Sequence, residues 1–293
     1  MNIQRVVQLI VVMLLWALCF PLITAGIASA PHLSFAAMRA FLAGAGLLAF
    51  GFALRRPLPK GGRVWGLLLL VGLSATSLGF FGMFHAAEFV SPGIATVIAN
   101  TQPLLAAILA HVILGEHLAA RGKVGLLLGF CGIVVITMPQ LLSWSEESYP
   151  IGFAYITLAA LGITVSNVLI KRLAGEVDGL MAMGFQLLIG GVPLGLLAWV
   201  SEKPETTVWS LDFVLILLSL SLLGTSLVYW LWFSVLEKVQ LNRANAFSFL
   251  IPIFALTMGF WLFGERLGWL EIGGIGLALL GIVLVNRDEV NRG

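Results

Sequence analysis

The chain alternates long apolar runs with short polar links. Ten of these runs are each close to the roughly 20 residues that a helix needs to cross a bilayer. They cover residues 6–28, 33–54, 64–86, 93–114, 122–139, 150–170, 179–200, 211–236, 242–263 and 269–286. The links between them, such as RRPLPKGGR and SWSEESYP, are too short to fold alone. The pattern predicts an all-α integral membrane protein with ten transmembrane helices and no separate soluble domain.

The first run has a second interpretation. Arg5, the apolar stretch after it and the small residues Ala28–Ser29–Ala30 are also typical of a cleaved signal peptide. The run has a counterpart at the start of the second half of the chain. We therefore expect it to be a true span.

The amino-acid composition is that of an integral membrane protein. Hydrophobic residues make up 60% of it and charged residues only 10%, whereas an ordinary soluble domain carries about 25% charged residues. The formal net charge of +2 gives no strongly basic surface for nucleic acid. Cys19 and Cys131 both lie in apolar runs and cannot support a disulfide framework. The partners to expect are lipid and a small molecule.

Basic residues set the orientation. If the N-terminus is cytoplasmic and ten spans alternate, the outer side keeps only Arg39, Lys203 and Arg266, which leaves 13 of the 16 basic residues inside. Cytoplasmic segments of membrane proteins carry an excess of Lys and Arg. We expect both termini to be cytoplasmic.

One sequence motif occurs twice in the chain. NTQPLLAAILAHVILGEHL begins at Asn100, and FLIPIFALTMGFWLFGERL begins at Phe249, 149 residues later. At this offset about 17 of 62 positions are identical between 76–137 and 225–286. The identities include Thr76/Thr225, Ser77/Ser226, Glu88/Glu237, Pro103/Pro252, Gly115/Gly264 and Glu116/Glu265. Earlier spans align more loosely, with Arg39 over Gln186. Shared Pro, Gly and Glu are far less expected by chance than shared Leu, so the chain contains a repeat.

The repeat predicts a mechanism. The two copies, 1–140 and 150–288, hold five spans each, and an odd number inverts the second copy in the membrane. Many secondary transporters build two related gates around one central site in this way. We expect alternating access, in which one half opens inward and the other outward.

A family resemblance rests on LLWALCF in the first span, MRAFLAG in the second, the P…GE.L phrase in both halves and the G..IGLALLGIVLV ending. With these the chain resembles the EamA type of the drug/metabolite transporter superfamily over its whole length. The resemblance implies a ten-helix exporter of amino acids and related metabolites in a bacterial-type inner membrane. It also implies a cavity lined by spans 1, 3, 4, 6, 8 and 9, with spans 5 and 10 outside it. The family often has W-G-x-N-F where this chain has Trp16-Ala17-Leu18-Cys19-Phe20. A polar group expected near the cavity is therefore missing, so the substrates of other family members are a weaker guide to the substrate of this chain.

The span 93–114 carries a polar stripe. Thr96, Asn100, Pro103, Ala107 and His111 follow one another at helical spacing and share one face. The stripe predicts a wall of a water-accessible cavity, with Pro103 as a bending point, or a polar packing seam between helices. His111 lies near the cytoplasmic end of the span. It is either a histidine at the membrane interface or a site that binds a proton.

Ionisable residues inside a membrane are costly and often functional. His85 lies on the predicted cavity face of the third span, and its ordinary pKa near neutrality suits proton coupling; a packing role is the alternative. Glu88 ends that span, as a gate residue or part of a short link. Arg39 lies about two turns from the outer face, where it can snorkel as a structural residue or form an outer gate with Glu88.

The candidate substrate-binding residues combine aromatic rings with amide and imidazole groups: Trp16, Phe20, Phe81, His85, Asn100, Asn167, Tyr229, Trp230, Phe233 and Asn245. The candidate gating residues are Arg39, Glu88, Pro103 and Pro252. Aromatic residues also serve packing and interface belts. The mixture suits a small zwitterion or amphiphile. It gives no clustered metal ligands, so we expect no metal and no cofactor.

Other classes of protein fit less well. Asp178, Asp212 and Asp288 all fall in links or at a span edge, which excludes a buried aspartyl pair, and no H-E-x-x-H motif exists. We therefore expect no enzyme. An exporter of lipophilic drugs and a membrane receptor or scaffold that binds without transport remain alternatives. Small residues in spans 5 and 10 let helices approach closely, either within the chain or between two copies of it. We therefore expect a monomer or a weak homodimer.

Overall fold

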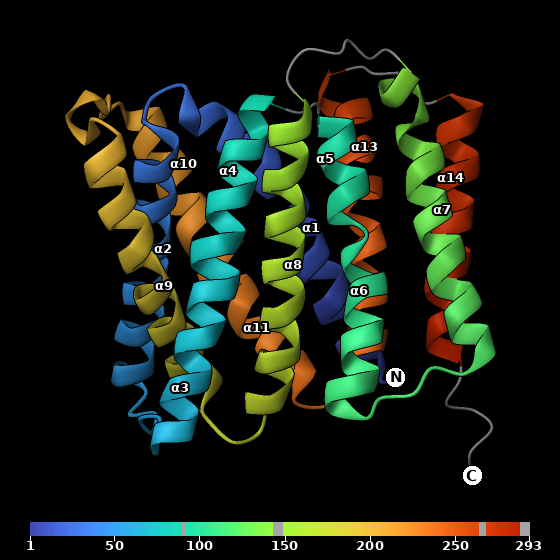
Figure 1. Cartoon of the computed structure of the whole chain (residues 1–293), viewed down its shortest axis with the longest axis horizontal. Helices are drawn as coiled ribbons and strands as arrows, with labels where there is room; N and C mark the ends of the chain where they lie inside the picture. Colours follow the sequence, from blue (N-terminus) through green and yellow to red (C-terminus); the bar gives the residue numbers. More distant parts are fainter. Residues whose placement is uncertain (90–91, 143–148, 264–267, 288–293) are drawn as a thin grey trace.

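Apolar helices build the described part of the protein. The computed structural model describes residues 1–89, 92–142, 149–263 and 268–287 (Figure 1). Within these ranges nine helices are long and apolar enough to cross a membrane. The chain is thus an all-helical, multi-pass membrane protein. The helical elements are α1 (Ile3–Ile27), α2 (His32–Ala53), α3 (Gly62–Val71), η1 (Gly72–Leu78), α4 (Gly79–Phe89), α5 (Pro92–Ala99), α6 (Gln102–Leu109), η2 (Ala110–Leu114), α7 (Ala120–Leu142), α8 (Tyr149–Leu173), α9 (Gly179–Ser201), η3 (Pro204–Thr206), α10 (Leu211–Ser221), η4 (Leu222–Leu227), α11 (Val228–Leu236), α12 (Leu241–Ala246), η5 (Phe247–Phe249), α13 (Leu250–Phe263) and α14 (Trp269–Asn286).

The predicted span that is missing from these nine helices, 242–263, corresponds to three consecutive segments. These are α12, η5 and α13, and none of them alone has the length of a span. The count of ten therefore stays a prediction. In Figure 1 the start of α1 and the end of α14 lie at the same end of the bundle. That agrees with an even number of crossings, and the side that faces the cytoplasm stays a prediction too.

Local sequence explains where several helices begin. The first N–H groups of a helix have no partner within it, so a side-chain oxygen just before them is stabilising. Asp178 accepts from the N–H groups of Leu180 and Met181 at 3.0 and 3.2 Å at the start of α9. Ser210 accepts from Phe213 N–H at 3.1 Å at the start of α10.

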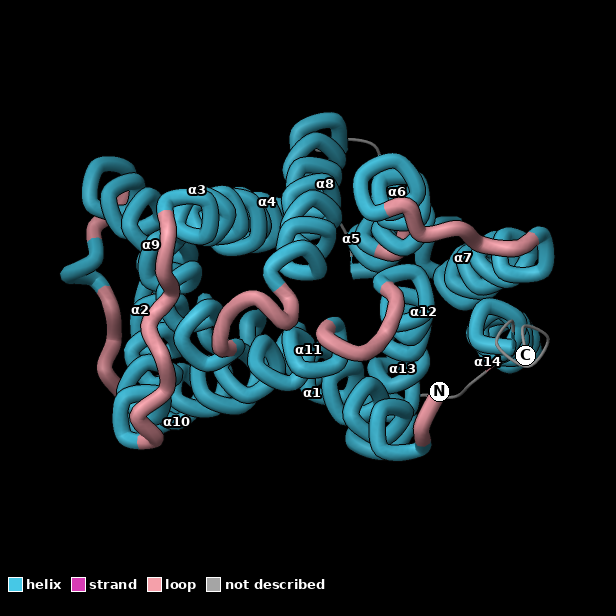
Figure 2. The backbone as a smooth tube through the Cα atoms, turned by 90° about the horizontal axis from the view of Figure 1, so that it is seen from below, coloured by secondary structure: helices cyan, strands magenta, loops and turns pink. Residues whose placement is uncertain are grey.

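Two helix pairs mark opposite ends of the molecule. α2 packs on α9 at one end, and α7 packs on α14 at the other (Figure 1). Helices α1, α4, α8, α11 and α13 lie between them, and Figure 2 shows the same order from below. The resemblance implied that spans 5 and 10, now α7 and α14, lie outside the central group of helices, and this arrangement agrees with it.

Glycine allows α7 and α14 to approach closely. A Cβ atom on Gly132 would lie 2.6 Å from the backbone of Gly274 and Ala278, and one on Gly281 would lie 2.5 Å from the carbonyl of Gly125. Backbone atoms at that distance cannot move aside as a flexible side chain can. The small residues predicted to serve either packing or dimerisation are therefore used between two helices of the same chain.

Four of the predicted spans are not continuous α-helices. Spans 64–86 and 211–236 contain the π-helical segments η1 and η4, and the 149-residue offset brings these segments into register. Spans 93–114 and 242–263 are interrupted at Asn100–Thr101 and at Phe247–Phe249, just before Pro103 and Pro252. Proline lacks an N–H group, and its ring clashes with the carbonyl four residues earlier, which explains the two breaks. The sequence predicted the bending points but not the π-helical segments.

Hydrogen bonds link η1 and η4 each to a helix of the other half. Thr76 donates to the side-chain carbonyl of Gln186 at 3.0 Å, and Ser77 donates to the Gly190 carbonyl at 2.7 Å.

The opposite side has the matching pair of bonds. Arg39 Nε donates to Thr225 Oγ1 at 2.8 Å, and Ser226 donates to the Ala43 carbonyl at 2.9 Å. Because Thr76 and Ser77 align with Thr225 and Ser226, and Arg39 aligns with Gln186, the same bridge occurs twice. This supports the predicted repeat.

A substitution pair on α14 tests the close helix contact. Gly281→Ala should lower the thermal unfolding midpoint of the purified protein, because overpacking costs about 1–3 kcal/mol. Gly276→Ala is the control, since a Cβ there meets nothing within 4 Å. It should leave the midpoint unchanged or raise it slightly, as alanine favours a helix over glycine. Equal midpoints for the two variants would contradict the assigned contact.

Candidate functional site

A buried polar cluster joins three helices at the centre of the bundle. Trp232 on α11 donates its indole N–H to Asn167 Oδ1 on α8 at 3.0 Å. Asn167 in turn approaches Asn245 Oδ1 on α12 at 3.5 Å. All three side chains are buried. Trp16 on α1 packs against Trp232 with ring centroids 5.4 Å apart. The cluster therefore combines residues of the predicted spans 1, 6, 8 and 9.

The structure brings together predicted site residues that lie far apart in sequence. Trp16, Asn167 and Asn245 all belong to this cluster, but the prediction omitted Trp232, the residue that connects them. Trp232 lies seven residues after Thr225 and so on the same helix face, and this spacing could have selected it.

Asn245 retains an unused donor. Its Nδ2 is buried and has no hydrogen-bond partner among the described residues. A buried polar group without a partner costs about 1–3 kcal/mol. A polar ligand or a water molecule at this position would remove the cost, which makes the amide a candidate for substrate contact.

Arg39 is buried inside the bundle. Only 2% of it is exposed, so it does not snorkel to the outer surface as the sequence suggested. Besides the bond to Thr225, its Nη2 lies 3.5 Å from the Gly224 carbonyl and 3.7 Å from Cys19 Sγ. Its guanidinium lies 4.6 Å from the centre of the Phe80 ring, a cation–π distance. No hydrogen-bond partner of Nη1 is found among the described residues.

A second titratable cluster lies where α2, α4 and α9 meet. His85 Nε2 is 3.3 Å from His32 Nε2, and His32 Nδ1 is 3.6 Å from a carboxylate oxygen of Glu202. Glu202 also accepts hydrogen bonds from the N–H groups of Leu33 and Ser34 at the start of α2. The three residues form a chain of groups that could pass a proton.

Hydrogen-bond partners suggest the tautomers of this chain. His85 Nδ1 lies 3.0 Å from the Phe81 carbonyl, which can only accept, so Nδ1 carries the hydrogen. The neutral His85 Nε2 then accepts from His32 Nε2, which leaves His32 Nδ1 facing Glu202. A proton added at that atom forms an ion pair with Glu202. The sequence did not predict a role for His32 and Glu202, because only folding brings them close to His85.

The remaining predicted residues have different surroundings. Phe81 packs against His85, with ring centroids 4.2 Å apart. Asn100 donates to the Thr96 carbonyl at 2.8 Å, at the break in its own helix. Phe233 is buried and packs on Gly179 at the start of α9. Tyr229 and Trp230 are half-buried. The side chains of Phe20 and Glu88 lie outside the described residues, and so does the predicted Arg39–Glu88 gate.

The repeated Gly-Glu motif has a structural role in the first half of the chain. The carboxylate of Glu116 accepts from the N–H groups of Leu241 and Asn242 at 2.8 and 3.1 Å, and so caps α12. Gly115, with a φ of 68°, ends η2 and lets the chain turn. The second copy, Gly264–Glu265, lies outside the described residues.

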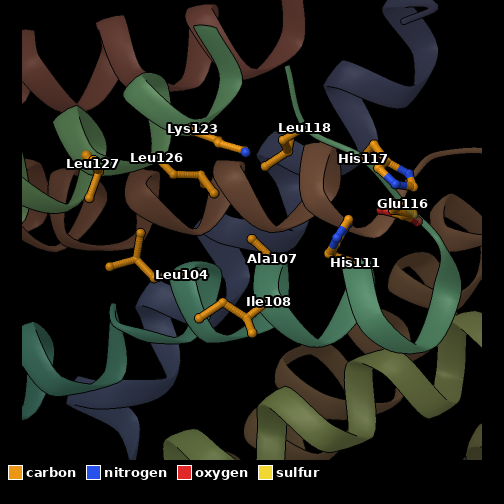
Figure 3. Close-up of a pocket in the computed structure, with 10 residues that line it drawn as sticks. All are labelled: Leu104, Ala107, Ile108, His111, Glu116, His117, Leu118, Lys123, Leu126 and Leu127. Carbon is orange, nitrogen blue, oxygen red and sulfur yellow. The ribbon is translucent and has the colours of Figure 1, made fainter. Parts of the chain in front are cut away.

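A cavity of about 460 Å³ lies between α6–η2 and α7 (Figure 3). Its lining includes Ala107 and His111, the last two residues of the polar stripe predicted from the sequence. No group of three or more potential metal ligands occurs in the part of the chain that the structure describes.

Comparison with known proteins identifies the class. The chain matches the EamA-like transporter family over residues 5–138 and again over residues 150–287. It is 28% identical to an uncharacterized transporter of Synechocystis over 98% of this chain and 91% of that one. It is 30% identical to a chloroplastic WAT1-related protein of Arabidopsis thaliana over 87% of this chain, but over only 63% of that protein.

Two further comparisons agree. The uncharacterized inner membrane transporter YedA of Escherichia coli is 28% identical over 94% of this chain and 88% of that one. A solved crystal structure superposes with a TM-score of 0.81 over 98% of this chain and 97% of the other, at 19% identity, which shows a shared fold. The protein is a membrane transporter, and it belongs to the EamA-like transporter family.

Proposed function

We propose that this transporter exports small metabolites, with amino acids or their derivatives foremost, by alternating access of two inverted halves, 1–140 and 150–288. One observation carries the proposal. The interruptions fall on corresponding spans in the two halves, the third and fourth and the eighth and ninth, while the other described spans are continuous helices. Paired weak points of this kind suit a carrier that opens first to one side and then to the other.

The breaks and bridges suggest how the halves move. The breaks before Pro103 and Pro252 divide their spans into parts that can tilt separately. The bridges of Thr76 and Thr225 hold the π-helical segments η1 and η4 to the opposite half, and π-helical segments frequently occur at functional sites. Opening one gate would bend one proline-containing span and leave the other in place. The central cluster of Trp16, Asn167 and Asn245 lies between these elements and would face the substrate.

Arg39 supports a substrate with a carboxylate. A charge at the centre of a membrane helix costs about 2.5–3.5 kcal/mol on insertion scales. The equivalent residue Gln186 makes the same bridge without a charge, so bridging alone does not require arginine. None of the ion pairs found among the described residues involves Arg39. A substrate carboxylate would supply the missing negative charge, which favours amino acids over neutral lipophilic drugs.

The histidine chain supports proton coupling as a second feature. His85, His32 and Glu202 form a chain of half-buried groups near the start of α2, and Tyr155 on α8 packs against His85 with centroids 5.0 Å apart. A proton taken up at His32 Nδ1, beside Glu202, would tie transport to the proton gradient. Facilitated diffusion without coupling is the alternative.

Substrate counterflow with purified protein in liposomes tests the central proposal. Labelled amino acids should exchange, and unlabelled members of the same chemical class should compete. Exchange of lipophilic cations instead would establish the drug exporter. Specific binding of a ligand without any exchange would establish a receptor or scaffold.

The two prolines should act on movement rather than on binding. We expect Pro103→Ala and Pro252→Ala to slow counterflow about tenfold, equivalent to about 1.4 kcal/mol in the barrier, with substrate affinity changed less. Pro193→Ala is the matched control, because Pro193 lies inside α9, which has no break. Equal losses of affinity and rate in both variants would rule out the hinge role.

Arg39→Gln should abolish discrimination for the carboxylate. Wild-type protein should prefer an amino acid to its amide by about tenfold or more, and the variant should bind both equally, since the lost ion pair no longer favours the acid. Gln186→Met removes the matching bridge without touching a charge and should keep the preference. If both variants keep it and lose only thermal stability, Arg39 is a structural bridge.

His85→Gln and His32→Gln should flatten the dependence of flux on pH between about pH 5 and 8, where histidine changes its charge. Asp212→Asn provides a control on an exposed acidic residue at the start of α10, outside the proposed sites. Glu88→Gln should be measured in parallel, since Glu88 is the other predicted proton site. An unchanged pH profile in all three site variants would leave facilitated diffusion as the mechanism.

A further inference from the structure

The cavity between α6–η2 and α7 has two chemically distinct ends. Figure 3 shows the apolar side chains of Leu104 and Leu127 at one side of the cavity and the rings of His111 and His117 at the other, which we call the mouth; Lys123 and Ile108 lie between the two sides. The remaining lining residues are Ala107, Glu116, Leu118 and Leu126. An elongated amphiphile with a polar head would match this division.

The apolar part belongs to the membrane. Its residues lie on the apolar spans Ala95–Leu114 and Ala120–Met138. Ile108 is 62% exposed and Leu127 is 56% exposed, so this side of the cavity opens toward the bilayer. Water finds no hydrogen-bond partners in an apolar space of this kind. An acyl chain of a neighbouring lipid fills it at no such cost.

The mouth is basic. The rings of His111 and His117 meet edge to face, with centroids 4.5 Å apart. His117 Nδ1 lies 2.7 Å from the Gly115 carbonyl and donates to it, which leaves Nε2 for another partner. Lys123 is exposed and takes part in none of the ion pairs found among the described residues.

The acidic residue of the lining has its partners in another helix. Glu116 is buried, and both of its carboxylate oxygens accept N–H groups at the start of α12. The helix start stabilises the negative charge of Glu116 there. Lys123 and the two imidazoles are thus available to an anion that enters through the mouth.

We propose that this groove binds one anionic phospholipid. Its phosphate lies at Lys123, His111 and His117, and one acyl chain lies along Leu104, Ile108 and Leu127. Basic pockets between membrane helices at the cytoplasmic side suit anionic head groups, and the predicted orientation places this mouth on that side. The lipid would lie against the span that contains Pro103 and against the cap that Glu116 makes on α12. It would therefore stabilise the inner end of that span.

The test measures lipid binding at equilibrium and does not depend on transport. Full-length protein purified in a neutral detergent is titrated with phosphatidylglycerol, and bound lipid is followed by native mass spectrometry and by the thermal unfolding midpoint. Wild-type protein should retain one phosphatidylglycerol in preference to phosphatidylcholine and should unfold at a higher temperature with it.

Two variants address the two ends of the site. Lys123→Gln should weaken phosphatidylglycerol binding about tenfold, the order expected for loss of a charge-assisted contact. Lys60→Gln removes an exposed lysine from the link between α2 and α3 and should change nothing. Ala107→Phe fills the apolar part and should prevent retention of the lipid although the charges remain.

Three results would overturn the proposal. One is equal binding of phosphatidylglycerol by wild-type protein, Lys123→Gln and Ala107→Phe. Another is equal retention of phosphatidylcholine, which would remove the role of charge. The third is full stabilisation by glycerol phosphate alone, which would identify a phosphate site without an acyl chain.

Discussion

The absence of water inside a bilayer is the constraint on which this structure depends. Every backbone group that leaves a regular helix must find a partner within the protein. Two of the described π-helical segments, η1 and η4, meet this constraint with their own hydroxyl groups. Ser74 of η1 donates to the Leu70 carbonyl at 2.6 Å, and Thr225 of η4 donates to the Leu220 carbonyl at 2.9 Å. In these two segments the irregular backbone therefore coincides with hydroxyl side chains that can support it.

The same constraint gives weight to the differences between the halves. In each half a threonine and a serine hydrogen-bond to the helix opposite, although Thr76 donates to Gln186 whereas Thr225 accepts from Arg39. Arg39 and Gln186 are not equivalent in charge, and Asn245 Nδ2 has no partner on the described residues. In the proposed mechanism the repeat would supply the symmetric movement, and departures from it would supply chemical selectivity. Under that proposal the exceptions to the repeat are the guide to the substrate.

Features with a local cause could be predicted from the sequence. The apolar runs were predicted within a few residues of the observed helices, as with 179–200 and Gly179–Ser201, because bilayer thickness fixes the length of a span. The breaks near Pro103 and Pro252 follow from proline chemistry. The contacts of Glu202 with α2, of Glu116 with α12 and of Trp232 with Asn167 could not be predicted, because each joins residues more than 60 positions apart. The burial of Arg39 was missed for the same reason.

Capping by distant carboxylates links helix ends to the movement that a carrier needs. Glu116 fixes the start of α12 from the link after η2, and Glu202 fixes the start of α2 from the end of α9. Lys171 on α8 donates to the carbonyls of Leu236 and Val239 at 2.6 and 2.8 Å at the end of α11. These contacts hold the ends of spans on neighbouring helices, whereas the breaks lie within the spans. In the proposed mechanism a carrier built in this way would bend between fixed ends, and its gates would move without loss of the contacts at helix ends.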